Sequence, residues 1–371
     1  MPPVRYHTGG FPPEVLDWPQ LIPLLGPAAA AVARYDGMLA WIPEAGVLLA
    51  PLTTQEAVLS SRIEGTQATM GEVLEFEAGH EAASPERRED IHEVQNYRAA
   101  MREAERLLGE LPLSQRLVRE THRTLLQGVR GQNKAPGEYR RIPNWIGPPG
   151  CSMEEARFIP ISADRLPDAM DRWERHIHEE TPDRLVQLAV LHAEFEALHP
   201  FLDGNGRLGR MLVPLFLWQR GLIRRPMFYM SAWLEARRDE YYERLLAVSR
   251  DGDWTGWCRF FIEGVRVQAE DNLLRTQAIL DLYTDLKHRL PAMTRSQHAV
   301  RALDWIFSRP VFSAPVFVQH SGIPAPTARR FLGVLRDEGV IKDIRPGRGR
   351  RAAILAFPAL LNIVEGREVF G

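Results

Sequence analysis

The segment His199–Arg210 reads HPFLDGNGRLGR and separates two stretches whose apolar residues recur with helical spacing. The first stretch, Arg184–His199, places its apolar residues on one stripe, and the second, Gly209–Arg220, is strongly apolar. We therefore expect a loop between two buried helices. The Gly-Asn-Gly run at 204–206 tolerates positive φ, so successive backbone N–H groups can converge on an anion. The loop predicts a phosphate site at the start of the second helix.

Polar side chains of the same loop add chemistry to this phosphate site. Arg207 and Arg210 lie three residues apart, so they project from one face of the first helical turn. Asp203 offers the hard oxygen ligand that a phosphate-bound Mg²⁺ ion prefers. His199 ends the first helix, where its imidazole can act as a general base toward an attacking hydroxyl.

Each of these features also has a plain structural interpretation. A Gly-Asn-Gly run is typical of tight turns, and a lone histidine such as His199 is often a core residue. The spacing Glu-x-x-His occurs at Glu89–His92 and at Glu196–His199, as in di-iron helical bundles. That metal site needs one Glu from each of two further helices and leaves the Gly-Asn-Gly-Arg run unexplained, so we favour the phosphate site.

The whole combination resembles the Fic-family signature H-x-F-x-[DE]-G-N-G-R-x-x-R, which this sequence matches at every specified position from His199 to Arg210. By general layout the resemblance extends over about Pro27–Gly264. Fic proteins have an all-helical core and transfer AMP from ATP to a Ser, Thr or Tyr hydroxyl of a protein. The resemblance therefore implies a protein adenylyltransferase with ATP and Mg²⁺ as cofactors.

The resemblance also implies a role for each matched residue. His199 would deprotonate the target hydroxyl, and Asp203 would hold Mg²⁺ between the α- and β-phosphates. Arg210 would bind the γ-phosphate, and Phe201 would anchor the loop in the core. The full set implied for ATP binding is Glu64, His199, Gly204, Asn205, Gly206, Arg207, Leu208, Gly209, Arg210 and Tyr242. The chemistry would be in-line attack at the α-phosphorus.

Two adjacent tyrosines, Tyr241 and Tyr242, lie on a helix expected at Arg237–Ser249, which in Fic proteins helps to enclose the nucleotide. Neighbours on a helix point about 100° apart, so only one of them can face the pocket squarely. We assign Tyr242 to ATP contact and Tyr241 to packing. Ser249, near the end of this helix, is expected to reach the adenine.

Upstream, Ser60–Gly65 reads SSRIEG and fits the family's inhibitory pattern [ST]-x-x-x-E-[GN], with Ser60 and Glu64 as its inhibitory residues. Glu64 lies at the end of a short helix, where the helix dipole disfavours an anion, so a compensating cation is expected. The resemblance implies that Arg210 is this cation, and that the pair keeps the γ-phosphate from its productive place. Because the motif precedes the catalytic segment, the chain resembles class II Fic proteins. The alternative is a solvated surface glutamate.

Residues 137–161 interrupt the helical pattern with short β-like runs around a Gly-Pro-Pro-Gly turn, which predicts a long hairpin. Its strands are expected at Asn144–Gly147 and Arg157–Pro160. The resemblance makes this hairpin the Fic flap. Four flap residues would dock an extended target segment by β-augmentation: Asn144, Trp145, Ile146 and Gly147. The alternative is a structural hairpin that covers the core.

From Pro291 onward the sequence is basic, with twelve Lys and Arg against six Asp and Glu, although the whole chain has a net charge of −2. The helices expected there are Ser296–Phe307, Ala314–His320 and Ala325–Glu338. They precede a hairpin with a basic tip at 345–351, an order that resembles a winged helix-turn-helix. DNA is therefore a candidate partner. The alternative function is a DNA-binding regulator with an accessory or deAMPylating Fic core.

The composition bounds the remaining expectations. Of 371 residues, 45% are hydrophobic and 25% charged, as in globular proteins. Two cysteines cannot build a disulfide framework, and no apolar run approaches the ~20 residues of a membrane helix, so we expect a cytoplasmic protein that binds no membrane. The expected protein partners are a hydroxyl-bearing target and the chain itself, which would modify itself; a homodimer stays open.

We expect a mainly α fold in four parts, with an irregular Pro- and Gly-rich arm over the first 25 residues. The parts are an N-terminal helical region with the inhibitory motif (1–110), a helical Fic core with the flap at 137–161 (111–264), a helical linker (265–290) and a C-terminal winged-helix-like domain (291–371).

Overall fold

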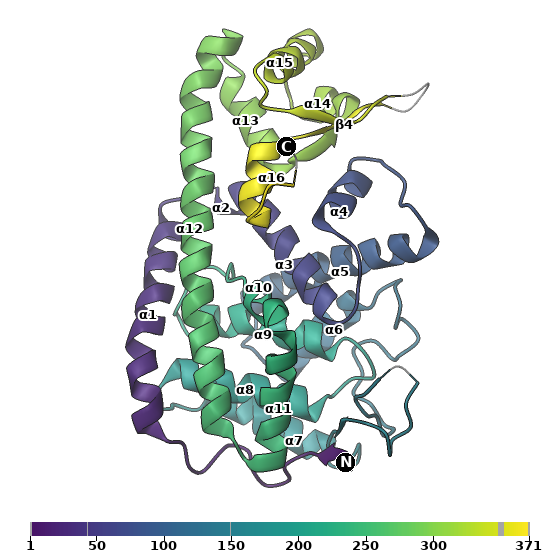
Figure 1. Cartoon of the computed structure of the whole chain (residues 1–371), viewed down its shortest axis with the longest axis vertical. Helices are drawn as coiled ribbons and strands as arrows, with labels where there is room; N and C mark the ends of the chain where they lie inside the picture. The colour runs from purple at the N-terminus through teal and green to yellow at the C-terminus, as the bar shows by residue number, and fades with distance from the viewer. Residues whose placement is uncertain (1, 43, 149, 348–351, 370–371) are drawn as a thin grey trace. The chain divides into compact units, whose positions relative to one another are not determined.

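The computed structural model describes residues 2–42, 44–148, 150–347 and 352–369, and it confirms the expectation of a mainly helical fold (Figure 1). The chain folds as two compact units. Unit 1 contains Met1–Asp36, Leu59–Gly65 and Asn96–Glu270, and unit 2 contains Gly37–Val58, Thr66–Gln95 and Asp271–Gly371. The candidate site residues from Ser60 to Glu64 and from Asn144 to Tyr242 all belong to unit 1.

The helices fall into three groups. Those of unit 1 alone are α6 (Gln115–Leu125), α7 (Leu166–His178), α8 (Arg184–Leu198), α9 (Asn205–Gln219), α10 (Ser231–Ala236) and α11 (Arg238–Asp251). Helices with residues in both units are α1 (Trp18–Ala40), α3 (Ala50–Ile63), α5 (Pro85–Leu108) and α12 (Trp254–Thr294). Those of unit 2 alone are α2 (Ala45–Leu48), α4 (Met70–Glu77), α13 (Ala299–Ser308), α14 (Ala314–His320), α15 (Ala325–Asp337) and α16 (Pro358–Glu365).

Helices α8 and α9 form the centre of unit 1 and are buried along most of their length. α8 begins where the Asp183 carboxylate accepts hydrogen bonds from the backbone N–H groups of Leu185 and Val186. Indole N–H groups from two neighbouring helices, Trp173 of α7 and Trp257 of α12, donate to carbonyl oxygens of α8. The helix that carries His199 at its end is therefore held from both sides.

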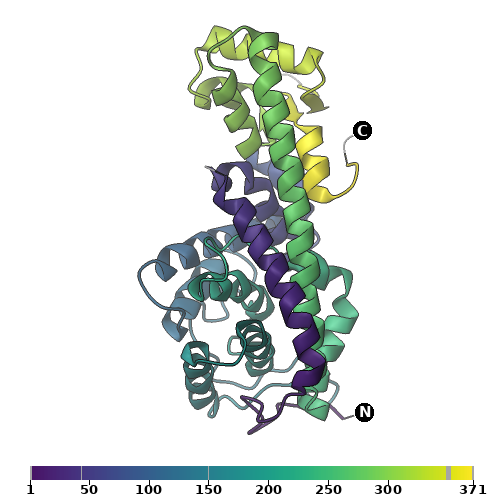
Figure 2. The same cartoon turned by 90° about the vertical axis from the view of Figure 1, so that its left-hand side faces the viewer.

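Helix α1 runs alongside the first part of α12 (Figure 2). Gln20 accepts a hydrogen bond of 2.9 Å from Arg259, and Arg34 lies 3.9 Å from Glu270. The expectation of an irregular arm over the first 25 residues is wrong from Trp18 onward, because α1 begins there and contains Pro23 and Pro27. Its buried apolar residues, which include Leu21, Ala28, Val32 and Tyr35, give it a packed face that outweighs the two prolines.

The predicted two-stranded hairpin at 137–161 is not formed as expected. Ile146 and Phe158 form a single antiparallel bridge, and strand β2 (Phe158–Ile159) pairs instead in parallel with strand β1 (Val4–Arg5) near the N-terminus. Pro143 and Pro148 flank the expected first strand, and because proline has no N–H, they limit the ladder on that side. Pro149 of the predicted turn lies outside the described residues.

The C-terminal part of unit 2 combines helices with a small antiparallel sheet. Its strands are β3 (Val311–Ser313), β4 (Lys342–Arg345) and β5 (Ile354–Ala356), in the order β3-β5-β4. Phe312 pairs with Leu355, and Asp343 pairs with Leu355 from the other side. Trp305 packs edge-on against Phe312 and Phe317 beside this sheet. Helix α12 continues past the boundary expected at Leu290-Pro291, and residues 348–351 of the predicted basic tip lie outside the described residues.

Two further features concern the chain as a whole. Within the described ranges, no helix is both long enough and apolar enough to cross a membrane. Both cysteines are free thiols, Cys258 buried and Cys151 partly exposed. Neither cysteine therefore forms a disulfide bond in this structure.

Candidate active site

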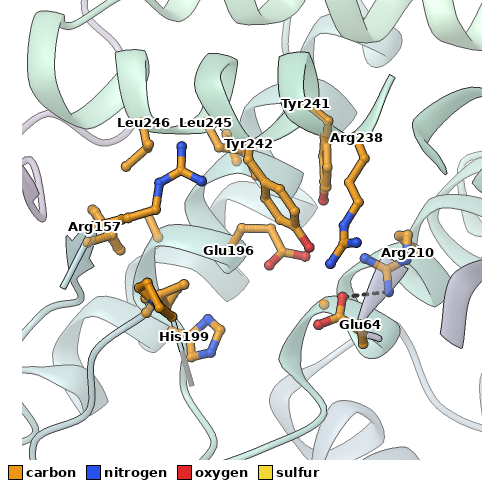
Figure 3. Close-up of a pocket in the computed structure, with 17 residues that line it drawn as sticks. Glu64, Arg157, Glu196, His199, Arg210, Arg238, Tyr241, Tyr242, Leu245 and Leu246 are labelled. Atoms are coloured by element: carbon orange, nitrogen blue, oxygen red, sulfur yellow. Dashed lines mark hydrogen bonds and ion pairs between the residues drawn. The ribbon is translucent and has the colours of Figure 1, made fainter. Parts of the chain in front are cut away.

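His199 ends α8 in a strained backbone conformation. It adopts φ 47° and ψ 60°, the left-handed region that non-glycine residues rarely occupy, and Pro200 follows it. The loop between α8 and α9 (residues 199–204) begins at this residue. We call it the α8–α9 loop. The left-handed turn directs the His199 imidazole toward a pocket rather than along the helix (Figure 3).

His122, a buried histidine of α6, contacts two residues of the α8–α9 loop, Phe201 and Asp203. The ring of His122 stacks on Phe201, with centroids 3.7 Å apart and planes 11° apart. The Gly137 N–H donates to His122 Nδ1 at 2.8 Å, so Nε2 carries the proton and donates to the Asp203 carbonyl oxygen at 2.9 Å. Burial lowers the pKa of His122 to about 4, which keeps the ring neutral. The sequence analysis missed this residue.

The Gly-Asn-Gly run departs from the expected loop conformation. Only Gly204 has a positive φ, 77°, and α9 begins at Asn205, four residues before the predicted start. The Asn205 amide explains the early start, because it accepts from the Phe201 N–H at 2.8 Å and donates to the Phe201 carbonyl at 2.9 Å. Gly206 is helical, so its backbone N–H lies in the first turn of α9, where a helix binds anions.

Asp203, the predicted Mg²⁺ ligand, lies beside the loop with its carboxylate 3.2 Å from Arg207 Nη2. About a third of the Asp203 side chain is exposed, whereas Arg207 is buried. Among the described residues, no group of three or more His, Cys, Asp and Glu side chains could hold a metal ion together. One accessible carboxylate suits a Mg²⁺ ion that takes its other ligands from phosphates and water.

Arg210 and Glu64 are brought together across 146 residues of sequence (Figure 3). Arg210 Nη2 donates to Glu64 Oε1 at 2.7 Å, and two further bonds join Arg210 to the hydroxyl and the carbonyl of Ser60. The guanidinium is buried, while a third of the Glu64 side chain is exposed. Burial would raise the pKa of the Glu64 carboxyl, but the charge of Arg210 outweighs it and holds this pKa below its usual value. Both groups are therefore charged at neutral pH.

The Glu64 carboxylate also lies directly against Gly206. A Cβ atom at Gly206 would collide with Glu64 Oε1 and would lie 3.1 Å from Arg210 Nη1. A larger residue at this position would therefore have to displace the Glu64 carboxylate. The negative charge of Glu64 therefore lies at the N-terminus of α9, where the helix dipole favours an anion.

A single cavity of about 380 Å³ joins these groups. Its polar end contains Glu64, Gly206 and Arg210, with His199 nearby (Figure 3). The rest of its wall comes from α8, α11 and the segment 146–158, and consists of Ile146, Gly147, Pro148, Arg157, Phe158, Ala193, Glu196, Ala197, Arg238, Tyr241, Tyr242, Leu245 and Leu246. A cavity of this size, lined by three arginines (Arg157, Arg210 and Arg238) together with apolar and aromatic side chains, suits a nucleotide.

Several predicted ligand residues lie outside this cavity. Gly204, Asn205, Arg207, Leu208, Gly209 and Asp203 do not line it, and neither do Asn144 and Trp145. Leu208 is fully buried in the core, and Gly209 abuts the Glu196 carboxyl. Ser249, expected near the adenine, is hydrogen-bonded at 2.8 Å to His7 of the N-terminal segment.

The two tyrosines have different surroundings, although both line the cavity. Tyr241 is fully buried and its hydroxyl lies 2.9 Å from His192 Nε2. Tyr242 is partly exposed, and its hydroxyl donates to the Ile63 carbonyl at 3.3 Å, next to Glu64. Tyr242 is therefore the tyrosine with surface available to a ligand.

Glu196 is a second acidic residue of the pocket wall. Its side chain is 12% exposed and points toward Tyr242 in Figure 3, and Oε1 has no hydrogen-bond partner among the described residues. Burial raises the pKa of Glu196 to about 8, Arg210 opposes this effect and Glu64 adds to it. Glu196 is therefore protonated and uncharged at neutral pH. Of the two glutamates that line the cavity, only Glu64 carries a negative charge.

Comparisons with known proteins identify the family to which the chain is similar. The Fic/DOC family N-terminal model matches residues 22–106, and the Fic/DOC family model matches residues 112–217. The chain is similar to the protein adenylyltransferase Fic of Drosophila ananassae, with 25% identity over 51% of this chain and 34% of that protein. The corresponding protein of Drosophila grimshawi is 24% identical over 56% of this chain and 39% of its own length. The chain thus spans only about a third of the length of these curated relatives.

Solved structures show the same fold at lower identity. A Fic family protein from Desulfovibrio desulfuricans G20 is 21% identical, covers 93% of this chain and 98% of its own, and gives a TM-score of 0.59. Fic-1 from C. elegans is 19% identical over 71% of this chain and 75% of its own, with a TM-score of 0.52. Since the two family models together match just over half of its residues, the chain belongs to the Fic/DOC family.

Proposed function

We propose that this chain is a protein adenylyltransferase that transfers AMP from ATP to a Ser, Thr or Tyr hydroxyl of a protein. One observation carries the proposal. A general base, a helix N-terminus free of side-chain bulk and a buried arginine line the same cavity, as His199, Gly206 and Arg210. The similarity to Drosophila proteins named protein adenylyltransferase Fic also supports the proposal.

The reaction follows from the positions of these groups. His199 accepts the proton of the target hydroxyl, and the hydroxyl oxygen forms a bond to the α-phosphorus. The bond from this phosphorus to the bridging oxygen breaks, and pyrophosphate leaves toward Arg210 and the first turn of α9. Burial lowers the pKa of His199 to about 4, so the imidazole is neutral and able to accept a proton at pH 7. Tyr242 and the apolar wall would receive the nucleoside.

Mg²⁺ is the second cofactor of the proposal, and Asp203 is the residue that would hold it. Bound Mg²⁺ would neutralise phosphate charge during the transfer. Arg207, 3.2 Å from Asp203, would hold the carboxylate in place and add positive charge near the phosphates. Gly204 and Asn205 would shape the loop beneath them.

The proposed enzyme is inhibited by its own Glu64, as in class II Fic proteins. The Glu64 carboxylate lies against Gly206 and pairs with Arg210, so it competes with the γ-phosphate for both the space and the cation. Ser60 holds the other side of the same guanidinium. ATP could still bind, but its triphosphate would lie in an unproductive position.

The segment around Ile146 and Gly147 is the proposed docking place for the target. The backbone N–H and C=O groups of Ile146 are already hydrogen-bonded to Arg157 and Phe158. The other edge of Phe158–Ile159 is paired with β1. An extended target segment would therefore add along the outer edge of residues 144–147, where the Trp145 side chain is 41% exposed. Self-modification would use the same edge.

Labelled ATP tests the reaction class. The chain is incubated with Mg²⁺ and ATP that carries the label at the α- or at the γ-phosphate. Protein-bound label from the α-position alone is expected for AMP transfer. Label from the γ-position would indicate a kinase and would overturn the proposal.

A DNA-binding role for the C-terminal part of unit 2 is the second candidate. Its order of α13, β3, α14, α15 and the β4–β5 pair matches a winged helix-turn-helix, and Arg329 and Arg330 are exposed on α15. Arg345 of β4 is instead paired with Glu75 of α4, at 2.9 Å. A gel shift with duplex DNA at rising salt tests this role. Binding should weaken steeply with salt and disappear in Arg329→Ala/Arg330→Ala; salt-independent binding would point to another kind of partner.

A further inference from the structure

Arg140 is a buried arginine without a carboxylate partner among the described residues. Only 3% of the surface of Arg140 is accessible to solvent, and no ion pair joins its guanidinium to a described Asp or Glu. Buried arginines without a counterion are rare, because removing a charge from water is costly unless other polar groups replace the water. The groups that replace it here are backbone carbonyls.

Arg140 donates hydrogen bonds to the carbonyls of three consecutive residues around the proposed base, one of them through its own backbone N–H, and to the carbonyl of Ile161. Arg140 Nε donates to the His199 carbonyl at 2.9 Å, and Nη2 donates to the Leu198 carbonyl at 3.2 Å. The backbone N–H of Arg140 donates to the Pro200 carbonyl at 2.9 Å. Nη2 also donates to the carbonyl of Ile161. Arg140 therefore fixes the peptide groups on both sides of His199.

The backbone at His199 needs such a contact. A left-handed residue at φ 47° is strained, and it persists only where the surroundings determine it. Helix ends also leave carbonyl oxygens without helical partners, and the carbonyl of Leu198, the last residue of α8, is one of them. Within the part of the chain that the structure describes, no side chain is hydrogen-bonded to the His199 ring, and its Nδ1 atom has no hydrogen-bond partner. The ring direction is thus set by the backbone, and the backbone is set by Arg140.

From this geometry we infer that Arg140 is a positioning residue for the proposed transfer, which aims the His199 imidazole at the target hydroxyl through the backbone around it. The inference rests on the function proposed above. The same guanidinium also supplies a fixed positive charge near the imidazole, which adds to the effect of burial in lowering the pKa of His199. Arg140 keeps that role only while it is charged; burial lowers its pKa to about 10, well above neutral pH.

Other charged and titratable groups face the same cavity and must stay constant in a test. They are Glu64 beyond α3, Arg157 near β2, Glu196 on α8, Arg210 on α9, and Arg238, Tyr241 and Tyr242 on α11. Of the charges that act on His199, Glu64 raises its pKa and Arg140 lowers it. Changing Arg140 alone therefore gives a shift of known sign.

The test compares Arg140→Lys, Arg140→Gln and the neighbouring control Arg141→Gln in the full chain. Arg141 is exposed and carries the same charge one residue away. Arg140→Lys keeps the charge but cannot reach all these carbonyls, so kcat should fall roughly 10- to 100-fold with KM for ATP nearly unchanged. Arg140→Gln should show the same loss and, in addition, an acid limb of the pH–rate profile that moves to higher pH. Arg141→Gln should behave as wild type.

A second readout does not depend on turnover. The His199 ring should titrate at a higher pH in Arg140→Gln than in wild type or Arg141→Gln, as followed by NMR. If neither wild type nor Glu64→Gly transfers AMP while this shift is present, the proposed function fails and the contact of Arg140 with the backbone of His199 stands. Unchanged kcat in both Arg140 variants, a loss expressed in KM alone, or failure of both variants to fold would each overturn the positioning role.

Discussion

The α8–α9 loop and the flap tip (residues 142–157) border the same cavity but are held in different ways. The loop is fixed by buried polar contacts from His122, Asn205 and Arg140, and almost every one ends on a backbone atom. The flap tip has one β-bridge at Ile146, and three of its large apolar residues are exposed: Ile142 by 58%, Trp145 by 41% and Ile146 by 36%. The difference fits the two tasks that we propose, in which the loop sets the geometry of the reaction and the flap tip binds a partner.

Replacing the proposed base should have the largest effect. His199→Ala should reduce AMP transfer by a factor on the order of 10²–10⁴, because no other group can accept the hydroxyl proton at that place. ATP binding measured by calorimetry should persist, because Gly206 and Arg210 at the phosphate end are unchanged. If ATP affinity is lost together with activity, this division of roles is wrong.

Two asparagines that contact the same carbonyl compare the two regions directly. Asn205 donates to the Phe201 carbonyl at 2.9 Å and accepts from its N–H, whereas Asn144 of the flap tip donates to that carbonyl at 3.3 Å. Asn205→Ala should lower the free energy of unfolding by ~2–3 kcal/mol, since it leaves a buried N–H unpaired. The matched variant Asn144→Ala should cost less than ~1 kcal/mol. Equal losses in denaturant unfolding would show that the flap tip is as firmly held as the loop.

Because the carboxyl of Glu196 is buried, the free energy of unfolding should depend on pH. No exposed residue of the flap tip should cause such a dependence. The Glu196 pKa of about 8 in the folded state lies above that of an unfolded glutamate, so folding stability is lost as pH rises through 8. Wild type should therefore lose ~1–3 kcal/mol more than Glu196→Gln between pH 6.5 and 8.5. Below pH 6.5 the buried neutral histidines His122, His192 and His199 act in the opposite direction, so the comparison starts above it. If the free energies of unfolding of wild type and Glu196→Gln change equally with pH, the Glu196 carboxyl is solvated rather than buried.

The smallest change in stability is expected in the flap tip. Trp145→Ala removes a side chain that is 41% exposed and one hydrogen bond to the Cys151 carbonyl, so it should cost less than ~1 kcal/mol. AMP transfer to a protein target should nevertheless fall several-fold, with ATP binding unchanged. Trp145→Phe, which keeps an apolar ring, is the control and should retain most of the transfer. A large loss of stability with normal transfer would make Trp145 a core residue instead.

The sequence predicts the parts of the site whose groups lie close together in the chain. His199, Gly206 and Arg210 meet in one cavity because a single loop and one helical turn carry them. The long helices are also predictable, since their apolar residues repeat over several turns. The contact between Glu64 and Arg210 spans 146 residues, so no local pattern contains it; the resemblance to a known family suggested it.

The missed residues act through backbone atoms. Arg140 and His122 bind carbonyl and amide groups, which every residue possesses, so no complementary side chain marks their partners in the sequence. Strands β1 and β2 have two residues each, too few to show alternation, and their pairing joins residues far apart in the chain. The early start of α9 depends on one amide, that of Asn205, in a run that equally suits a turn.

The central claim is that Glu64 restrains an otherwise complete active site, and self-modification with α-labelled ATP in Glu64→Gly tests it most directly. Removing the carboxylate frees Arg210 and the space at Gly206 for the γ-phosphate. A charge-assisted contact of about 1.5–3 kcal/mol corresponds to a gain of roughly 10- to 150-fold in rate. The gain should disappear in Glu64→Gly/Arg210→Ala, because the same arginine is needed for the productive position of ATP. Activity of Glu64→Gly equal to or below wild type at saturating ATP would contradict the account.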